Sequence, residues 1–171
     1  MNSGLILLRR LGLESPRLWY RGINLGDASN IVRWRSDPQV YRYYRSPGPI
    51  SIHRHLEWFS SEYCGNPSRA EFIILEKNSH RPIGFAGIYT EDSKDAELGY
   101  TIGECSARGR GFATETLGTL VSSFSTLGFS SFFLEIHPKN NASIRVAQKC
   151  GFSLSGHTAL GFQRHTLGLL Q

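Results

Sequence analysis

The sequence has no apolar run long enough to cross a membrane and very few cysteines. No segment approaches the roughly 18 consecutive apolar residues of a transmembrane helix, and residues 1–8 run from apolar into two arginines, the reverse of a secretory signal. The three cysteines, Cys64, Cys105 and Cys150, have no metal-ligand spacing, and any disulfide scheme leaves one unpaired. These features predict a cytoplasmic protein with reduced thiols, no metal site and no membrane partner.

The chain also lacks the two best-known phosphate loops and any block of basic residues. A P-loop needs Gly-Lys-Ser/Thr after four spacer residues, which does not occur, and the dinucleotide fingerprint fails because Thr114 stands where its third glycine belongs. The net charge is +5 and the pI is near 9.3, but the arginines are spread along the sequence. This distribution favours a small anionic molecule over nucleic acid as a partner.

The length of 171 residues, with 40% hydrophobic and 12% aromatic residues, predicts one domain with a substantial core. Residues 1–15 are an extension in which we expect Leu5 to Leu13 to add a strand rather than a flexible arm, and Asp27 is expected to cap a helix. The periodicity predicts strands at 18–21, 70–76, 82–89, 96–104, 132–136, 152–158 and 164–170, and helices at 28–35, from 38, from 51, at 112–127 and at 141–150. This order favours an α/β fold built on a mixed sheet with helices on both faces.

The rest of the chain is organised around one glycine-containing loop. A strand-like run, 96–104, precedes it and a helix-like run, 112–127, follows it. Such an order leaves backbone N–H groups unpaired at a helix N-terminus, where they and the helix dipole attract phosphates. Its glycines allow close backbone approach and its arginines add positive charge. The loop consists of Arg108, Gly109, Arg110, Gly111, Phe112 and Ala113.

The pattern Arg108-x-x-Gly111-x-Ala113 resembles the coenzyme A pyrophosphate signature of the GNAT N-acetyltransferases, Gln/Arg-x-x-Gly-x-Gly/Ala. The segment His-Pro-Lys-Asn-Asn-Ala-Ser-Ile-Arg at 137–145, followed by Gly-Phe at 151–152, is similar to the family's next strand and helix. An ordinary helix N-terminus followed by a second helix is the alternative. The resemblance covers about residues 17–170 and implies a single acetyltransferase domain over 1–171, with a mixed, mostly antiparallel central sheet. It also implies acetyl-CoA as co-substrate and a primary amine as acceptor.

The resemblance assigns the coenzyme contacts. It implies that backbone N–H groups from Arg108 to Ala113 hold the pyrophosphate and that Asn140 lies beside the pantetheine arm. Backbone N–H groups of the strand 98–101 would stabilise the oxyanion. Asn140 also suits a helix N-cap, and the two roles are compatible.

Glu97 is the best candidate for the general base. On a strand its side chain points with Gly99 and Thr101 and away from the aliphatic residues between them. If the aliphatic face is core, Glu97 faces the cleft and can collect the ammonium proton directly or through one water. The alternative is an exposed strand glutamate. His137 is a weaker rival, because His-Pro at that place is expected to shape a turn.

The general acid is less well defined. The tyrosine that much of the family carries four residues before the final glycine is here Ala147. Ser143 is the nearest remaining hydroxyl, as in the ribosomal-protein acetyltransferase branch. It can equally be a first-turn helix serine, with water protonating the thiolate.

The acceptor is expected to be held by the segment before the sheet. Trp34-Arg35 and His55-x-x-Trp58 resemble the amino-sugar-nucleotide N-acetyltransferases of pseudaminic-type acid synthesis. In that hypothesis Arg35 grips a diphosphate, while Tyr44, His55 or Trp58 stacks on base or sugar. The alternative places the tryptophans in the core.

A nucleotide-linked amino sugar is therefore the favoured acceptor. The alternative acceptors are a protein N-terminus, as in the ribosomal-protein branch, and another small amine. A non-catalytic coenzyme A-binding protein is the alternative from another class. A homodimer is compatible with the sequence.

Overall fold

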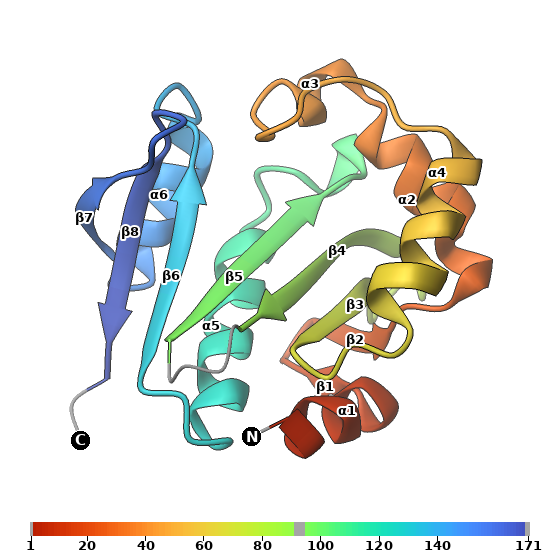
Figure 1. Ribbon diagram of the computed structural model, residues 1–171, viewed down its shortest axis with the longest axis horizontal. Helices are drawn as coiled ribbons and strands as arrows, with labels where there is room; N and C mark the ends of the chain where they lie inside the picture. Colours follow the sequence, from red (N-terminus) through yellow and green to blue (C-terminus); the bar gives the residue numbers. More distant parts are fainter. Residues whose placement is uncertain (1, 91–94, 170–171) are drawn as a thin grey trace.

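A computed structural model describes residues 2–90 and 95–169, and Figure 1 shows a curved sheet flanked by helices. The helices are α1 (Asn2–Leu11), α2 (Ala28–Arg35), α3 (Pro38–Tyr41), α4 (Ile52–Trp58), α5 (Phe112–Ser125) and α6 (Asn141–Lys149). The strands are β1 (Leu13–Glu14), β2 (Leu18–Gly22), β3 (Arg69–Glu76), β4 (Pro82–Tyr89), β5 (Asp95–Ile102), β6 (Ser131–Ile136), β7 (Ser153–His157) and β8 (Gln163–Gly168). No helix of the described part is long and apolar enough to span a bilayer.

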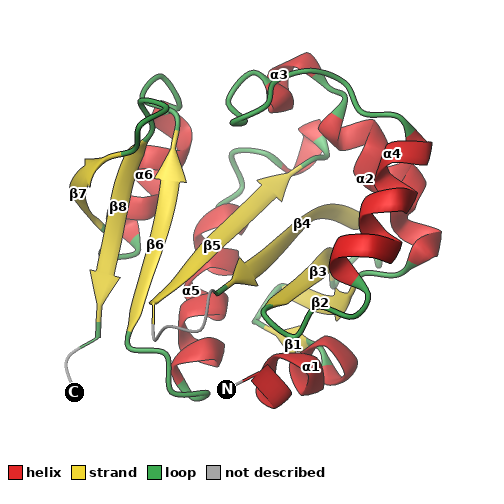
Figure 2. Cartoon of the chain, in the orientation of Figure 1, coloured by secondary structure: helices red, strands yellow, loops and turns green. Residues whose placement is uncertain are grey.

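The eight strands lie in the order β1-β2-β3-β4-β5-β6-β8-β7. The pair β5–β6 is parallel and the other neighbouring strands of the described sheet are antiparallel. Helices α5 and α6 cover one face, and α2 and α4 cover the other (Figure 2). The predicted mixed, mostly antiparallel sheet with helices on both faces is therefore confirmed.

Two hydrophobic cores follow from the two-residue period of the strands. In β3, Phe72 and Ile74 point toward α5, where Phe72 packs against Phe124 with ring centroids 6.4 Å apart. Ile73 points the other way and joins Trp34 of α2 in the second core. The sheet therefore forms a middle layer whose two faces are both covered near β3.

The N-terminal extension corrects one expectation, because the predicted strand Leu5–Leu13 is the helix α1 followed by the two-residue strand β1. Leu5 and Leu8 are three residues apart and face the same core, with Leu5 fully buried. The helix ends at Leu11, and the next residue, Gly12, has a φ of 77°. The Gly12 N–H donates a hydrogen bond to the Leu8 carbonyl at 2.8 Å, which closes the last turn. A short apolar run fits a strand or a buried helix equally well, and packing on β2 and β3 selects the helix.

Helix α2 has the predicted bounds, but Asp27 does not cap it. Its buried carboxylate instead forms a bidentate ion pair with Arg21 at 2.6 and 2.7 Å and accepts the Asn24 N–H at 2.9 Å. A charged partner from β2 therefore outcompetes the local helix amides. The other predicted strands and helices are present, with ends that shift by up to about two residues; residue 170, the expected end of the last strand, lies outside the described residues.

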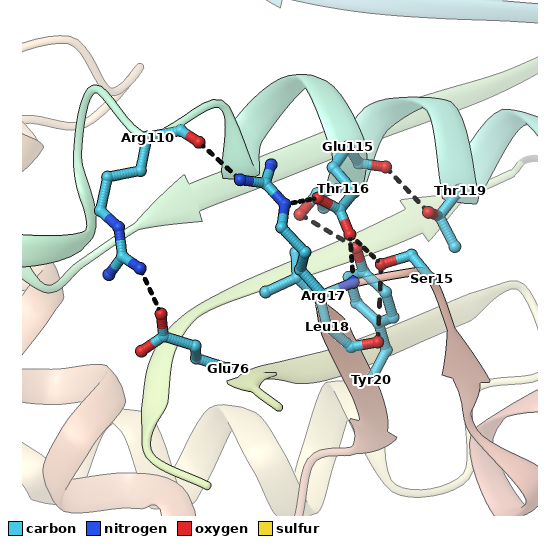
Figure 3. A network of polar contacts seen from close by, with 9 residues as sticks. All are labelled: Ser15, Arg17, Leu18, Tyr20, Glu76, Arg110, Glu115, Thr116 and Thr119. Carbon is cyan, nitrogen blue, oxygen red and sulfur yellow. Dashed lines mark hydrogen bonds and ion pairs between the residues drawn. The ribbon is translucent and has the colours of Figure 1, made fainter. Parts of the chain in front are cut away.

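A polar network fastens the β2 edge of the sheet to the first turn of α5 (Figure 3). The carboxylate of Glu115 accepts hydrogen bonds from the Ser15 hydroxyl (2.6 Å), the Arg17 backbone N–H (2.8 Å) and the Arg17 Nε (2.6 Å). The Arg17 guanidinium also donates to the Arg110 carbonyl at 3.0 Å. Because α5 begins at the glycine loop, this network fixes the loop against the sheet.

We expect Glu115→Ala to destabilise the protein by about 2 kcal/mol, because it removes one charged acceptor from three donors. Arg17→Ala should cost less, since that side chain is half exposed and Glu115 keeps its other two bonds. Chemical denaturation at pH 7 measures both.

The stability lost in Glu115→Ala should also depend on pH. Burial raises the pKa of Glu115, but Ser15 and Arg17 outweigh it and hold the pKa below its usual range. The stabilisation is therefore complete above the ordinary carboxyl pKa and is lost as the pH falls through the depressed one. Equal losses for the two variants, or a loss independent of pH, would contradict a central role for the Glu115 carboxylate.

Candidate active site

The site begins where two strands of the sheet part. β5 and β6 pair only through Asp95–Glu97 and Ser131–Phe133. From Leu98 onward the edge of β5 that faces β6 has no ladder partner among the described residues, although its other edge stays paired with β4. Figure 1 shows the resulting V between the two strands. An open strand edge offers backbone hydrogen-bonding groups to an extended ligand.

The glycine loop lies at the wide end of this V and starts α5. Gly109 and Gly111 have φ values of 74° and 81°, which glycine adopts without steric cost. Gly111 is the N-cap and has no side-chain acceptor, and the first intrahelical bond runs from the Glu115 N–H to its carbonyl at 3.1 Å. The N–H groups of residues 112–114 precede that bond, so the helix N-terminus can receive an anion.

The two loop arginines use their side chains to brace the loop. Arg108 donates to Asp37 and Gln39 at 3.1 Å each and to two carbonyls at the end of β5. Arg110 pairs with Glu76 at 2.5 Å. The sequence predicted positive charge at the loop, and the structure adds that both guanidinium groups already have protein partners.

A cavity of about 1000 Å³ extends from the glycine loop along the open edge of β5 to the side of the sheet covered by α2 and α3. The predicted site residues that line it are Arg35, Tyr44, Glu97, Arg108, Gly109, Gly111, Phe112, Ala113, Asn140 and Ser143. Those that do not line it are Trp34, His55, Trp58 and Arg110.

The aromatic residues expected at the acceptor are mostly core residues. Trp34 is 1% exposed, and its indole N–H donates to Glu104 at 2.8 Å. His55 is buried, and burial lowers its pKa. Trp58 lies against His55 and Tyr63 with centroids 5.5 Å away in each case. The alternative noted for the tryptophans, packing on the sheet, matches their observed positions.

Glu97 lies at the apex of the V, in an ion pair. Its carboxylate bonds to Arg45 at 2.5 Å, and the same nitrogen of Arg45 contacts Glu135 of β6 at 2.6 Å. Arg45 thus bridges the two strands just where they separate. Burial raises the pKa of Glu97, Arg45 opposes this shift, and the neighbouring Glu135 reinforces it. A raised pKa makes this carboxylate a better proton acceptor, which is the direction that a general base requires.

A second carboxylate, Glu71 on β3, was missed by the sequence reasoning. It lines the cavity in register with Gly87 of β4 and Gly99 of β5. The Glu71 side chain lies over Gly87, and the space above Gly99 is open. Burial raises the pKa of Glu71, and Arg69, 3.5 Å away, is the main opposing charge. The signal was available, because charged residues alternate with apolar ones at the start of β3.

Arg35 has an unusual environment for a cation. Its guanidinium lies over the Tyr44 ring at 4.7 Å, and its Nε is buried without a hydrogen-bond partner. No hydrogen bond or ion pair joins it to the described residues. Tyr44 is held by a 2.7 Å hydrogen bond with Thr101 of β5. The cavity wall therefore presents a fixed positive charge with free donors.

The turn after β6 forms the opposite wall. Asn140 caps α6 by accepting the Ser143 N–H at 3.2 Å, so its N-cap role is present. His137 Nδ1 accepts the Lys139 N–H at 3.1 Å and lies within the turn, consistent with shaping it. Among the described residues no group of three or more His, Cys, Asp or Glu side chains is arranged to hold a metal ion.

The family model of the acetyltransferase (GNAT) domain matches residues 17–153 of this chain. The chain is 31% identical over 150 residues to the uncharacterised N-acetyltransferase YoaA of Bacillus subtilis, covering 84% of each chain. It is 27% identical over 149 residues to the uncharacterised N-acetyltransferase p20 of Bacillus licheniformis, covering 84% of this chain and 83% of the relative. A 25% identical match to the uncharacterised protein MJ1062 of Methanocaldococcus jannaschii covers 81% of this chain but only 28% of that longer protein.

Solved structures agree on the fold. A domain from Methanocaldococcus jannaschii superposes with a TM-score of 0.82 at 21% identity, covering 90% of this chain and 99% of the domain. The spermidine N-acetyltransferase of Vibrio cholerae, solved with CoA and spermine, gives 0.80 at 17% identity, covering 90% and 96%. The aminoglycoside acetyltransferase AAC(6')-Ib with coenzyme A gives 0.76 at 17% identity, covering 88% and 94%.

The family match, these relatives and the open strand edge beside a glycine-started helix lead to one conclusion: the chain belongs to the GNAT acetyltransferases and is an N-acetyltransferase that uses acetyl-CoA.

Proposed function

We propose that the enzyme, acting as one acetyltransferase domain, acetylates the primary amine of a small acceptor that also carries an anionic group, with a nucleotide-linked amino sugar as the best fit. The observation that carries this proposal is Arg35, a cavity cation with an unpartnered Nε. The oxygen atoms of a diphosphate would accept hydrogen bonds from the planar guanidinium group of Arg35. Trp34, His55 and Trp58 support this wall from behind and do not contact the acceptor.

The coenzyme occupies the other half of the cavity. Backbone N–H groups of the loop 108–113 and the start of α5 hold the pyrophosphate. The pantetheine arm follows the open edge of β5, opposite Asn140 and Ser143. This path brings the thioester toward the apex of the V, where Glu97 lies.

Glu97 acts as the base in a direct transfer. It takes the proton of the acceptor ammonium, and the neutral amine attacks the thioester carbonyl. The new C–N bond gives a tetrahedral oxyanion, which backbone N–H groups of β5 hold, and its collapse breaks the C–S bond. The second proton of the attacking amine passes through Ser143 or water to the leaving coenzyme A thiolate, so that the amide and the thiol are both neutral. The ion pair with Arg45 must loosen for Glu97 to reach the amine.

A second acceptor class is a polycationic amine. Two structural neighbours were solved as a spermidine and an aminoglycoside acetyltransferase. The carboxylates Glu71, Glu97 and Glu135 all line the cavity and can attract ammonium groups.

Gly111→Val should weaken acetyl-CoA binding at least tenfold, because its side chain stands where the backbone must approach the pyrophosphate. The matched control is Gly128→Val, a glycine with a similar positive φ (90°) at the far end of α5 and with open space around it. Calorimetry compares the two folded variants. Unchanged acetyl-CoA affinity in Gly111→Val would show that the coenzyme does not bind at this loop.

Glu97→Gln should lower kcat by about 10²–10⁴, the usual range for loss of a general base, with little effect on acetyl-CoA affinity. Higher pH should restore part of the rate, because more of the amine is then neutral. A variant with wild-type rates at every pH would remove Glu97 from the mechanism.

Arg45→Met should move the acidic limb of the kcat/KM profile to higher pH. Removing Arg45 leaves only the weaker influence of Arg69 against burial and Glu135, so the pKa of Glu97 rises further and the base is protonated over a wider range. Arg42→Met is the control, since Arg42 lines the cavity but lies over Tyr43. Equal shifts in both variants would mean that Arg45 has no specific influence on Glu97.

Arg35→Ala should raise the KM for a UDP-amino sugar by tenfold or more and change the KM for the free amino sugar much less. The KM for acetyl-CoA should stay nearly constant. Arg33→Ala is the control on the same helix, because Arg33 pairs with Glu104 outside the cavity. Equal losses with both acceptors would make Arg35 structural. If wild-type enzyme prefers spermidine or an aminoglycoside, the polycationic class replaces the nucleotide-linked one.

A further inference from the structure

Tyr100 of β5 carries a buried hydroxyl group that has no hydrogen-bond partner among residues 2–90 and 95–169. Its ring packs against the main hydrophobic core, on the face of β5 opposite Glu97. Leaving such a group unpaired costs about 1–3 kcal/mol, and buried polar groups in native proteins are almost always satisfied. An orphaned hydroxyl at the wall of a ligand cavity therefore points to a partner that arrives with the ligand.

The position of Tyr100 identifies which part of the cavity this is. Tyr100 lies three residues beyond the apex residue Glu97, on the stretch of β5 that is paired with β4 but no longer with β6. It lines the cavity together with Ser143 of the first turn of α6. The Ser143 hydroxyl is close enough to lower the pKa of Tyr100, but the two make no hydrogen bond of normal geometry. The part of the cavity that Tyr100 and Ser143 line lies between the glycine loop and the apex of the V at Glu97.

Tyr100 can serve here as a donor. Burial raises its pKa to about 12, so the phenol stays protonated at any physiological pH. Its O–H can then donate to an uncharged acceptor such as an amide oxygen. Along the proposed path of the coenzyme, the groups of that kind belong to the pantetheine arm.

We propose that the Tyr100 hydroxyl donates a hydrogen bond to an amide oxygen of the pantetheine arm and is satisfied only when coenzyme A is bound. The inference rests on the proposed placement of the coenzyme along β5. Tyr100 is then a positioning residue, which fixes the arm so that the thioester reaches the apex. Its hydrogen bond also helps to distinguish the complete coenzyme from its nucleotide portion.

Tyr100→Phe tests this by binding and by stability. The variant should lose about tenfold in affinity for coenzyme A, the equivalent of 1.4 kcal/mol, and should bind 3′,5′-ADP, which has no pantetheine arm, as the wild type does. Without ligand the variant should be at least as stable as the wild type, because an unsatisfied hydroxyl has been removed. Its thermal stabilisation by coenzyme A should be smaller.

Tyr44→Phe is the matched control. Its hydroxyl has a protein partner, Thr101 at 2.7 Å, so this variant should be less stable without ligand and should keep its affinity for coenzyme A. Unchanged coenzyme A affinity in Tyr100→Phe, or an equal loss for 3′,5′-ADP, would overturn the proposal. Gly111→Val tests the placement of the coenzyme separately from the role of Tyr100. If the loop binds the pyrophosphate, this variant should weaken coenzyme A and also 3′,5′-ADP, which keeps one phosphate of that group, whatever the role of Tyr100.

Discussion

The parting of β5 from β6 is the feature on which the site depends. Three residue pairs hold the strands together at the apex, and beyond Glu97 the ladder stops. A buried strand edge with unpaired amides is costly in a folded protein. This edge borders the cavity, where water or a ligand can complete the hydrogen bonding. The glycine loop and the first turn of α6 flank the same opening (Figure 1), so one interruption of the sheet positions every wall of the cavity.

The arginines at the two ends of this cavity differ in whether they have protein partners. At the glycine loop the side-chain cations are already paired, Arg108 with Asp37 and Arg110 with Glu76, so backbone amides are left for an anion. On the other side the Arg35 Nε has no hydrogen-bond partner in the part of the chain that the structure describes, while Arg45 is bound to two carboxylates. The paired arginines rigidify the walls, and the unpaired one remains available for recognition.

Local sequence predicted the elements that carry their own signals. Two-residue alternation marked β3, β4 and β5, and Gly111 at the start of a 3.6-residue period marked the loop and α5. The chemistry of a helix N-terminus follows from these local features alone. Where a short apolar run had no such signal, as at Leu5–Leu13, packing decided between strand and helix. Asp27 likewise had a local role open to it and took a distant partner, Arg21.

The sequence by itself therefore determined the order of elements from residue 18 onward, the glycine loop and the strand that bears Glu97. Only the tertiary structure decided which polar groups share the cavity. Trp34 and Trp58 look like ligand-stacking residues in the sequence but lie outside it, whereas Glu71 and Tyr100 enter it from strands that read as core. The physical reason is that burial and pairing depend on residues far apart in the chain: whether a hydroxyl or guanidinium is satisfied is settled when β5, α2 and α6 meet.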